Sequence, residues 1–239
     1  MPSIRLDKIV SDSGVCSRSG AAALIKSGRV AVDGKIVLTR AAGFDPDAVR
    51  VTVDGKPVDY SRYRYIILNK PKGYVSATED RYEKTVMELL DEKYSKLGLF
   101  PAGRLDKDAE GLLLLTNDGD LAHKVMSPAA GIEKRYFVEL DSDITAEDIK
   151  VLSEGITLGD GTKCQPAVLE HAQGGAFVTL HEGKYHQVKR MMAALGKPVK
   201  NLTRVSIGRL ELDPGLKPGQ YREIHRDIIN EIYELETKK

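Results

Sequence analysis

A short turn near the middle of the chain holds a carboxylate in a setting that suits catalysis. Asp106 ends the segment Gly103-Arg104-Leu105-Asp106, and another glycine, Gly111, precedes the apolar run 112–116. Glycines let the backbone adopt positive φ and let a substrate approach closely, while a neighbouring arginine favours the charged form of an acid. An isolated Asp in such a turn more often only satisfies the turn. Other segments must therefore decide between a catalytic Asp106 and a structural one.

Composition describes an ordinary globular protein of one or two domains. The 239 residues are 41% hydrophobic and 30% charged, with no run of eighteen apolar residues and no apolar leader behind Met1. We therefore expect a soluble, cytoplasmic protein without membrane association. The two cysteines, Cys16 and Cys164, lie far apart and lack the spacing of a zinc site or of a disulfide framework.

Basic residues are unevenly distributed although the net charge is only +1. Residues 1–64 carry 11 Lys and Arg against 7 Asp and Glu, and residues 181–209 carry 7 against 1. Two separate basic surfaces could contact one nucleic acid while the rest of the protein stays solvated. Plain solvated faces also collect charge, so this pattern alone leaves both interpretations open.

The first sixty residues predict a small α-α-β unit. Apolar residues recur at helical spacing within 4–28, with Ser17 placed to cap a second helix and Gly28 to end it. In the two segments that follow, 30–37 and 51–58, apolar and polar residues alternate on either side of an Asp-Gly pair. These pairs, Asp33-Gly34 and Asp54-Gly55, are typical of tight hairpin turns. The basic residues on these helices and at their ends are Arg5, Lys8, Arg18, Lys26 and Arg29.

The polar segment 60–64 marks the predicted boundary between this unit, 1–60, and a larger domain, 65–239. The larger part lacks the regular strand-helix alternation of a doubly wound sheet and therefore predicts a mixed, mostly antiparallel α+β domain. The predicted strands are 65–68, 112–116, 136–140, 167–170, 176–180 and 205–212, and the predicted helices are 86–90, 121–125, 146–154 and 187–195.

The amino-terminal segments resemble an S4-type RNA-binding domain. The likeness is carried by Arg5-Leu6-Asp7-Lys8, Ser17-Arg18 and the run 25–34, and it covers about one quarter of the chain. It implies a basic helical face that docks on structured RNA through phosphates and groove shape.

Four segments of the larger domain resemble the RsuA-type family of pseudouridine synthases. They are Leu68-Asn69-Lys70-Pro71-Lys72-Gly73-Tyr74, Gly103-Arg104-Leu105-Asp106, Glu133-Lys134-Arg135-Tyr136 and Glu182-Gly183-Lys184-Tyr185-His186-Gln187-Val188-Lys189-Arg190-Met191. Their order behind an S4-like unit is more specific than any one of them. The segment 165–170 favours the branch acting on 16S rRNA of the small subunit, with 23S rRNA as the alternative.

The resemblance implies an isomerase that swings a uridine out of the RNA, detaches uracil at N1 and reattaches it through C5. It implies that Asp106 is the nucleophile or base, that Tyr136 stacks on the displaced uracil and that Lys189 pairs with Asp106, with Arg190 as the alternative cation. We predict Asp106, Tyr136 and Lys189 as the catalytic residues. The reaction needs no cofactor and no metal, and the sequence has no glycine loop or ligand cluster for either.

Further cations are predicted to contact RNA. By resemblance Arg104 helps hold the extruded uridine out, although an ion pair with Asp108 or Glu110 would also explain it. The others are predicted to meet phosphates or line the entrance, namely Lys70, Lys72, Lys134, Arg135 and Arg190. The expected partner is ribosomal RNA or an assembly intermediate, bound by a monomer. A non-catalytic RNA-binding protein and a hydrolase using Asp106 with Asp108 are the competing hypotheses.

Overall fold

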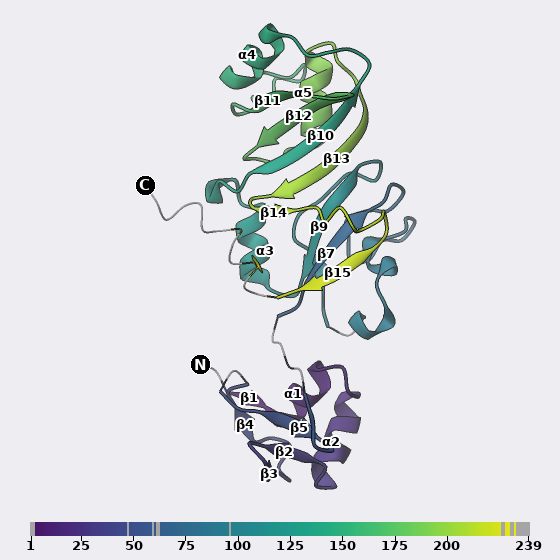
Figure 1. Ribbon diagram of the computed structural model, residues 1–239, viewed down its shortest axis with the longest axis vertical. Coiled ribbons are helices and arrows are strands. Elements are labelled where there is room, and N and C mark those ends of the chain that lie inside the picture. The colour runs from purple at the N-terminus through teal and green to yellow at the C-terminus, as the bar shows by residue number, and fades with distance from the viewer. Residues whose placement is uncertain are drawn as a thin grey trace. The chain divides into compact units, whose positions relative to one another are not determined.

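The computed structural model describes residues 3–46, 48–58, 60, 63–95, 97–225, 228, 229 and 232 (Figure 1). The chain divides into two compact units, Met1–Tyr63 and Arg64–Lys239. Residues 61 and 62 of the expected linker lie outside the described part, so the predicted boundary stays a prediction.

The first unit is a helix pair with two small sheets. Its helices are α1 (Leu6–Asp12) and α2 (Arg18–Lys26), and its strands are β1 (Ile4–Arg5), β2 (Val30–Val32), β3 (Lys35–Ile36), β4 (Gly43–Phe44), β5 (Val51–Val53) and β6 (Lys56–Pro57). Strands β1 and β4 pair, and the other four form a sheet in the order β3-β2-β5-β6. Apolar residues of both helices and of β2 and β5 form one buried cluster, which stabilises the unit.

The local signals of the first unit are confirmed. The Ser17 side chain accepts a hydrogen bond from the Gly20 amide at 3.2 Å and caps α2, and Gly28 has a φ of +74° just beyond its end. Both hairpins turn through an Asp-Gly pair with positive φ at both residues, as a tight turn between twisted strands requires.

The second unit is built on a nine-stranded sheet, described in the order β11-β12-β10-β13-β9-β7-β15, with β14 on β13 and β8 on β9. The strands are β7 (Tyr65–Lys70), β8 (Phe100–Pro101), β9 (Glu110–Thr116), β10 (Lys134–Leu140), β11 (Val168–Ala172), β12 (Gly175–Leu180), β13 (Val199–Ile207), β14 (Leu210–Glu211) and β15 (Tyr221–Ile224). Its described pairings are antiparallel except for β13 with β9. The predicted α+β class is confirmed.

The parallel pairing of β9 with β13 joins two halves of this sheet, one containing β11, β12, β10 and β13 and the other containing β9, β7 and β15. Figure 1 shows the first half above the second. It is short, matching Thr203 with Glu110 and Arg204 with Gly111. Gly111 has a φ of +103°, and a Cβ there would lie 2.3 Å from the Arg204 carbonyl oxygen. Because only glycine allows this approach, Gly111 fixes where the end of the Asp106 loop meets β13.

Helices cover different parts of the sheet. Helices α4 (Ala146–Glu154) and α5 (Gln187–Ala194) share a buried cluster with β10, β11 and β12. The 3-10 helices Val86–Leu89 and Glu92–Tyr94 contribute to a second cluster with β7 and β9. Helix α3 (Gly119–Met126) follows β9 and is capped by Asp118, and Pro128–Ala130 forms a further 3-10 turn. No helix in the described part of the chain is long and apolar enough to cross a membrane.

Two strand assignments need correction. The strand predicted at 205–212 is instead β13, which begins at Val199, and a turn at Gly208 separates it from the short β14. Four of the five residues in 200–204 are polar, and the buried Arg204 occupies a position that an apolar side chain usually takes, so the start of the strand lacks the expected apolar alternation. Strand β15 was not predicted; its sequence, YREI, has little apolar character, and its pairing with β7 defines it.

Candidate active site

A pocket of about 630 Å³ lies where the Asp106 loop, β10, β13 and the start of α5 meet. Its polar and charged lining residues include Ser76, Arg104, Asp106, Lys134, Tyr136, Glu182, His186 and Arg204. Three of the four segments that the sequence singled out, those at 103–106, 133–136 and 182–191, therefore converge on one cavity large enough for a nucleotide, whereas no residue of the segment 68–74 lines it.

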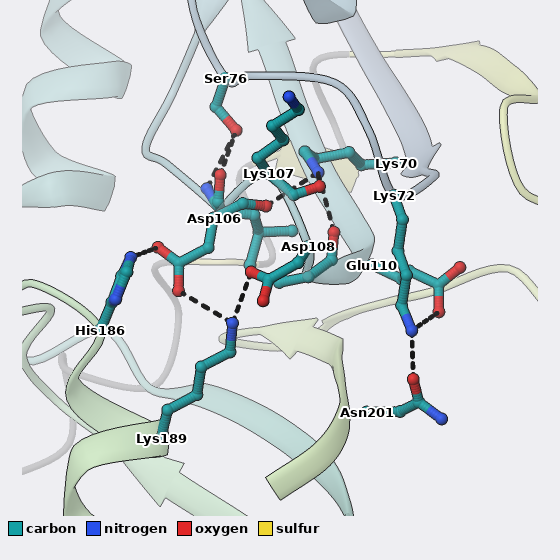
Figure 2. A network of polar contacts seen from close by, with 12 residues as sticks. Lys70, Lys72, Ser76, Asp106, Lys107, Asp108, Glu110, His186, Lys189 and Asn201 are labelled. Carbon is teal, nitrogen blue, oxygen red and sulfur yellow. Dashed lines mark hydrogen bonds and ion pairs between the residues drawn. The ribbon is translucent and has the colours of Figure 1, made fainter.

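Asp106 faces two side chains of the α5 region (Figure 2). The Lys189 ammonium lies 3.7 Å from Asp106 Oδ2, and His186 Nε2 lies 3.5 Å from Oδ1. The Asp106 side chain is 26% exposed, so it is shielded from bulk water yet reachable from the pocket. A half-buried carboxylate beside a permanent cation is the arrangement expected of a nucleophile or base.

Lys189 is shared between two carboxylates. Its ammonium also donates a hydrogen bond to Asp108 at 2.5 Å, and this bond holds the pKa of Asp108 below its ordinary value despite the opposing effect of burial. Lys189 is not among the residues that line the pocket. Its contacts among the described residues are with the carboxylates of Asp106 and Asp108.

The loop before α5 is held by a buried polar network. Gln187 donates to Glu182 at 2.6 Å and accepts from the Lys184 amide at 2.8 Å, and the Lys184 ammonium donates to Glu182 at 2.6 Å. His186 adopts a left-handed φ of +49°, rare for a residue with a side chain. This turn aims the His186 ring at Asp106, and the ring is stacked on exposed Tyr185.

Lys70 does not line the entrance, and its predicted role as a substrate-binding cation is wrong. The side chain is fully buried, and its ammonium donates to the backbone carbonyls of Pro71, Asp106 and Ala109 at 2.8–3.1 Å. Burial lowers the pKa of Lys70 to about 8, although the nearby carboxylates, Asp108 foremost, oppose the shift. Lys70 therefore fixes the backbone of the loop that carries Asp106 (Figure 2).

Replacing Lys70 should destabilise the second unit. K70M leaves buried carbonyls without donors, and we expect it to lower the free energy of unfolding by about 3 kcal/mol and the melting temperature by roughly 6–12 °C. K72M is the matched control, because Lys72 is exposed beyond Pro71 and contacts Asn201 and Glu110 at the surface. Calorimetry should show less than about 1 kcal/mol for it. Equal melting temperatures for wild type and K70M would contradict this assignment.

The three residues of the Lys134-Arg135-Tyr136 segment do not face the same way. Lys134 and Tyr136 alternate inward on β10 and line the pocket, at 8% and 9% exposure. Arg135 faces the other side, where it pairs with Glu170 at 2.9 Å and lies over the Phe177 ring. The prediction that Lys134 and Arg135 together meet phosphates is wrong at this pocket, because neighbouring strand residues point to opposite faces.

The remaining cations of the second unit are divided between the pocket and its surroundings. Arg104 is exposed and lines the pocket, as a residue that meets an incoming strand should. Arg190 turns away and pairs with Asp160 at 2.5 Å. The alternative pairing of Arg190 with Asp106 is therefore not present.

The predicted RNA-binding cations of the first unit are largely paired. Ion pairs join Arg5 to Asp7, Lys8 to Asp12 and Arg29 to Asp54. Arg18 and Lys26, at opposite ends of α2, are exposed, and no salt bridge joins either to another described residue.

Three pocket residues were not identified from the sequence as parts of the site. Ser76 holds the Leu105 backbone through two hydrogen bonds, His186 contacts Asp106, and Arg204 is a buried residue of the pocket lining. Of these three, only His186 could have been suspected from the sequence, because it lies in the segment 182–191 that carries the family resemblance. Among the described residues, no group of three or more His, Cys, Asp or Glu could hold a metal ion.

Comparisons with known proteins agree with this geometry. The sequence matches the RNA pseudouridylate synthase family over residues 64–194 and the S4 domain over residues 4–40. It is 45% identical to YtzG, an uncharacterized RNA pseudouridine synthase of Bacillus subtilis, over 97% of this chain and 99% of that protein. It is 40% identical to ribosomal small subunit pseudouridine synthase A of Escherichia coli, over 96% of this chain and 100% of that protein.

A solved structure extends the agreement to the fold. A crystal structure of a pseudouridylate synthase aligns with 96% of this chain and all of its own, with 34% identity and a TM-score of 0.67. The family match covers more than half of the chain and contains Asp106, Tyr136 and Lys189. The chain therefore belongs to the RNA pseudouridylate synthase family.

Proposed function

We propose that this enzyme converts one specific uridine of 16S rRNA to pseudouridine. The observation that carries the proposal is Asp106, which lies in the pocket against the Lys189 ammonium at 3.7 Å. The choice of 16S rRNA is supported by relatives named ribosomal small subunit pseudouridine synthase A, of which this chain covers the full length. A 23S rRNA substrate is the alternative.

In the proposed reaction Asp106 is the group that acts on the nucleotide, as nucleophile or base, at C1′, C2′ or C6. Tyr136 stacks on the extruded uracil from the β10 side of the pocket. Lys189 holds the Asp106 carboxylate in place. Arg104, exposed at the pocket, meets the RNA where the uridine leaves the stack.

The first unit supplies a sequence-tolerant RNA contact in this proposal. Arg18 and Lys26 on α2 are its best candidates, because they are exposed and form no salt bridge with a described residue that would compete with phosphates. Arg5, Lys8 and Arg29 would first have to release their carboxylates. The proposed partner is ribosomal RNA or an assembly intermediate, bound in the cytoplasm by a monomer.

Release of tritium from C5 of uracil tests the function, because isomerisation expels that hydrogen. With 16S rRNA transcripts labelled at C5 we expect the enzyme to release one tritium equivalent per RNA molecule, from a single site located by mapping modified uridines. Matched 23S transcripts and small-subunit assembly intermediates are assayed in parallel.

The outcomes separate the hypotheses. Tritium release from 23S rRNA alone would show that the substrate is 23S rRNA and would leave the proposed reaction unchanged. Tight binding to these RNAs with no release from any of them would favour a non-catalytic RNA-binding protein.

A further inference from the structure

Two buried cations line the pocket, and no carboxylate of the described residues forms an ion pair with either. Arg204 is 3% exposed and Lys134 is 8% exposed, and both are pocket residues. Arg204 Nε donates to the Leu112 carbonyl at 2.8 Å and Nη1 donates to the Arg104 carbonyl at 3.5 Å, whereas Nη2 has no hydrogen-bond partner among the described residues. Lys134 makes no side-chain hydrogen bond or ion pair with a described residue.

A buried, unpaired charge is costly and calls for an explanation. Burial, followed by the positive charge of Arg204, lowers the pKa of Lys134 to about 8, and no anionic group offsets either effect. Glu182, the buried carboxylate of the lining, is already bound to Lys184, Gln187 and the Gln165 amide. Within the described part of the chain, the pocket thus holds two buried positive charges that are not paired with a carboxylate.

The lining residues differ in how exposed they are, and an entering nucleotide would meet the exposed ones first. Arg104 is exposed, Asp106 is 26% exposed, and Lys134 and Arg204 are nearly inaccessible. Tyr136 and Arg204 are paired residues on neighbouring strands, so their side chains share the face of the sheet that lines the pocket. If the phosphate stays near the exposed arginine and the ribose reaches Asp106, the base lies among Tyr136, Lys134 and Arg204.

We propose that Lys134 and Arg204 bind the oxygens of the detached uracil and stabilise the negative charge that the ring carries between bond breaking and bond making. This inference rests on the proposed isomerisation. When the N1–C1′ bond breaks, its electron pair stays on the ring and is shared between N1, O2 and O4. Meanwhile Asp106 bonds to C1′ as N1 leaves, or takes the C2′ proton. After the ring turns, C5 bonds to C1′ as the Asp106–C1′ bond breaks or as the proton returns to C2′; the C5 proton leaves and N1 takes up a proton, so the product is an isomer. The same cations also hold the anionic ring against escape.

Single-turnover kinetics of K134M test this inference. The substrates are short RNAs with uridine or 5-fluorouridine at the position that the wild type modifies, and the disappearance of the starting nucleoside is followed by chromatography. We expect K134M to lose about 100-fold in rate on uridine, with RNA affinity within about threefold of wild type. The loss should shrink to about tenfold on 5-fluorouridine, because fluorine withdraws electrons and makes the anion easier to form. K134R should recover most of the rate.

R135M is the matched control, since Arg135 is the neighbouring cation on the opposite face and should leave the rate unchanged. K134Q, which keeps a hydrogen-bond donor without the charge, replaces K134M if that variant does not fold. A rate within threefold of wild type, or an equal loss on both nucleosides, would overturn the role in anion stabilisation. Loss of RNA affinity at an unchanged rate would overturn it in favour of a phosphate contact. Inactivity of the wild type would instead refute the proposed function.

Discussion

D106N should abolish isomerisation while leaving RNA binding within about threefold of wild type. Asparagine has nearly the same shape as aspartate, but it is neutral and can neither attack C1′ or C6 nor take a proton from C2′. Removing a group that touches the reacting atoms costs at least about 10⁴-fold in rate. Tritium release under single-turnover conditions measures the rate, and filter binding of the same RNA measures the affinity.

D108N is the control for this experiment, because Asp108 is a second carboxylate bound to the same lysine, at 2.5 Å from its ammonium. Its side chain is 72% exposed and it is not part of the pocket lining. We expect D108N to lose less than about tenfold, because Lys189 remains beside Asp106. If D108N were inactive and D106N active, the essential carboxylate would have been assigned to the wrong residue.

The local structure around Asp106 was predictable because short-range rules dictate it. A glycine-rich turn, an apolar strand and a capped helix each follow from residues within a few positions of one another. Helix 146–154 and the Asp-Gly hairpins are confirmed for the same reason. The resemblance of the four ordered segments then predicted that distant parts of the chain form one site, which hydrophobic periodicity alone could not predict.

The roles of the cations were less predictable, because they depend on long-range packing. Lys70 reads as an exposed lysine beside a proline, yet carbonyls nearly forty residues away surround its ammonium. Arg204 lies in a strand whose first residues are polar, yet its side chain is buried where β13 pairs with Gly111 of β9. The side chains of Lys134 and Arg135 lie in different surroundings because one face of β10 lines the pocket and the other faces outward. A sequence shows that a residue is basic; the fold decides whether it meets RNA, a carboxylate or a backbone.

Replacement of Lys189 should be the next most damaging change after that of Asp106. K189M removes the only permanent cation among the described residues that contacts the Asp106 carboxylate, at 3.7 Å, and leaves His186 as its remaining charged or polar partner there. We expect kcat to fall by about 100- to 1000-fold, because a half-buried carboxylate without its cation is poorly held and poorly stabilised. KM should change little, since Lys189 does not line the pocket.

Rescue by arginine distinguishes this role from a purely structural one. K189R keeps a permanent charge on the same face of α5, so we expect it to regain at least tenfold of the lost rate, whereas an uncharged K189Q should not. R190M is the matched control, because Arg190 is the next cation on α5 and is bound to Asp160 at 2.5 Å, away from Asp106. Its kcat should stay within about threefold of wild type. A larger loss in R190M than in K189M would mean that the cation supporting Asp106 during the reaction is Arg190, and that α5 must rotate when RNA binds.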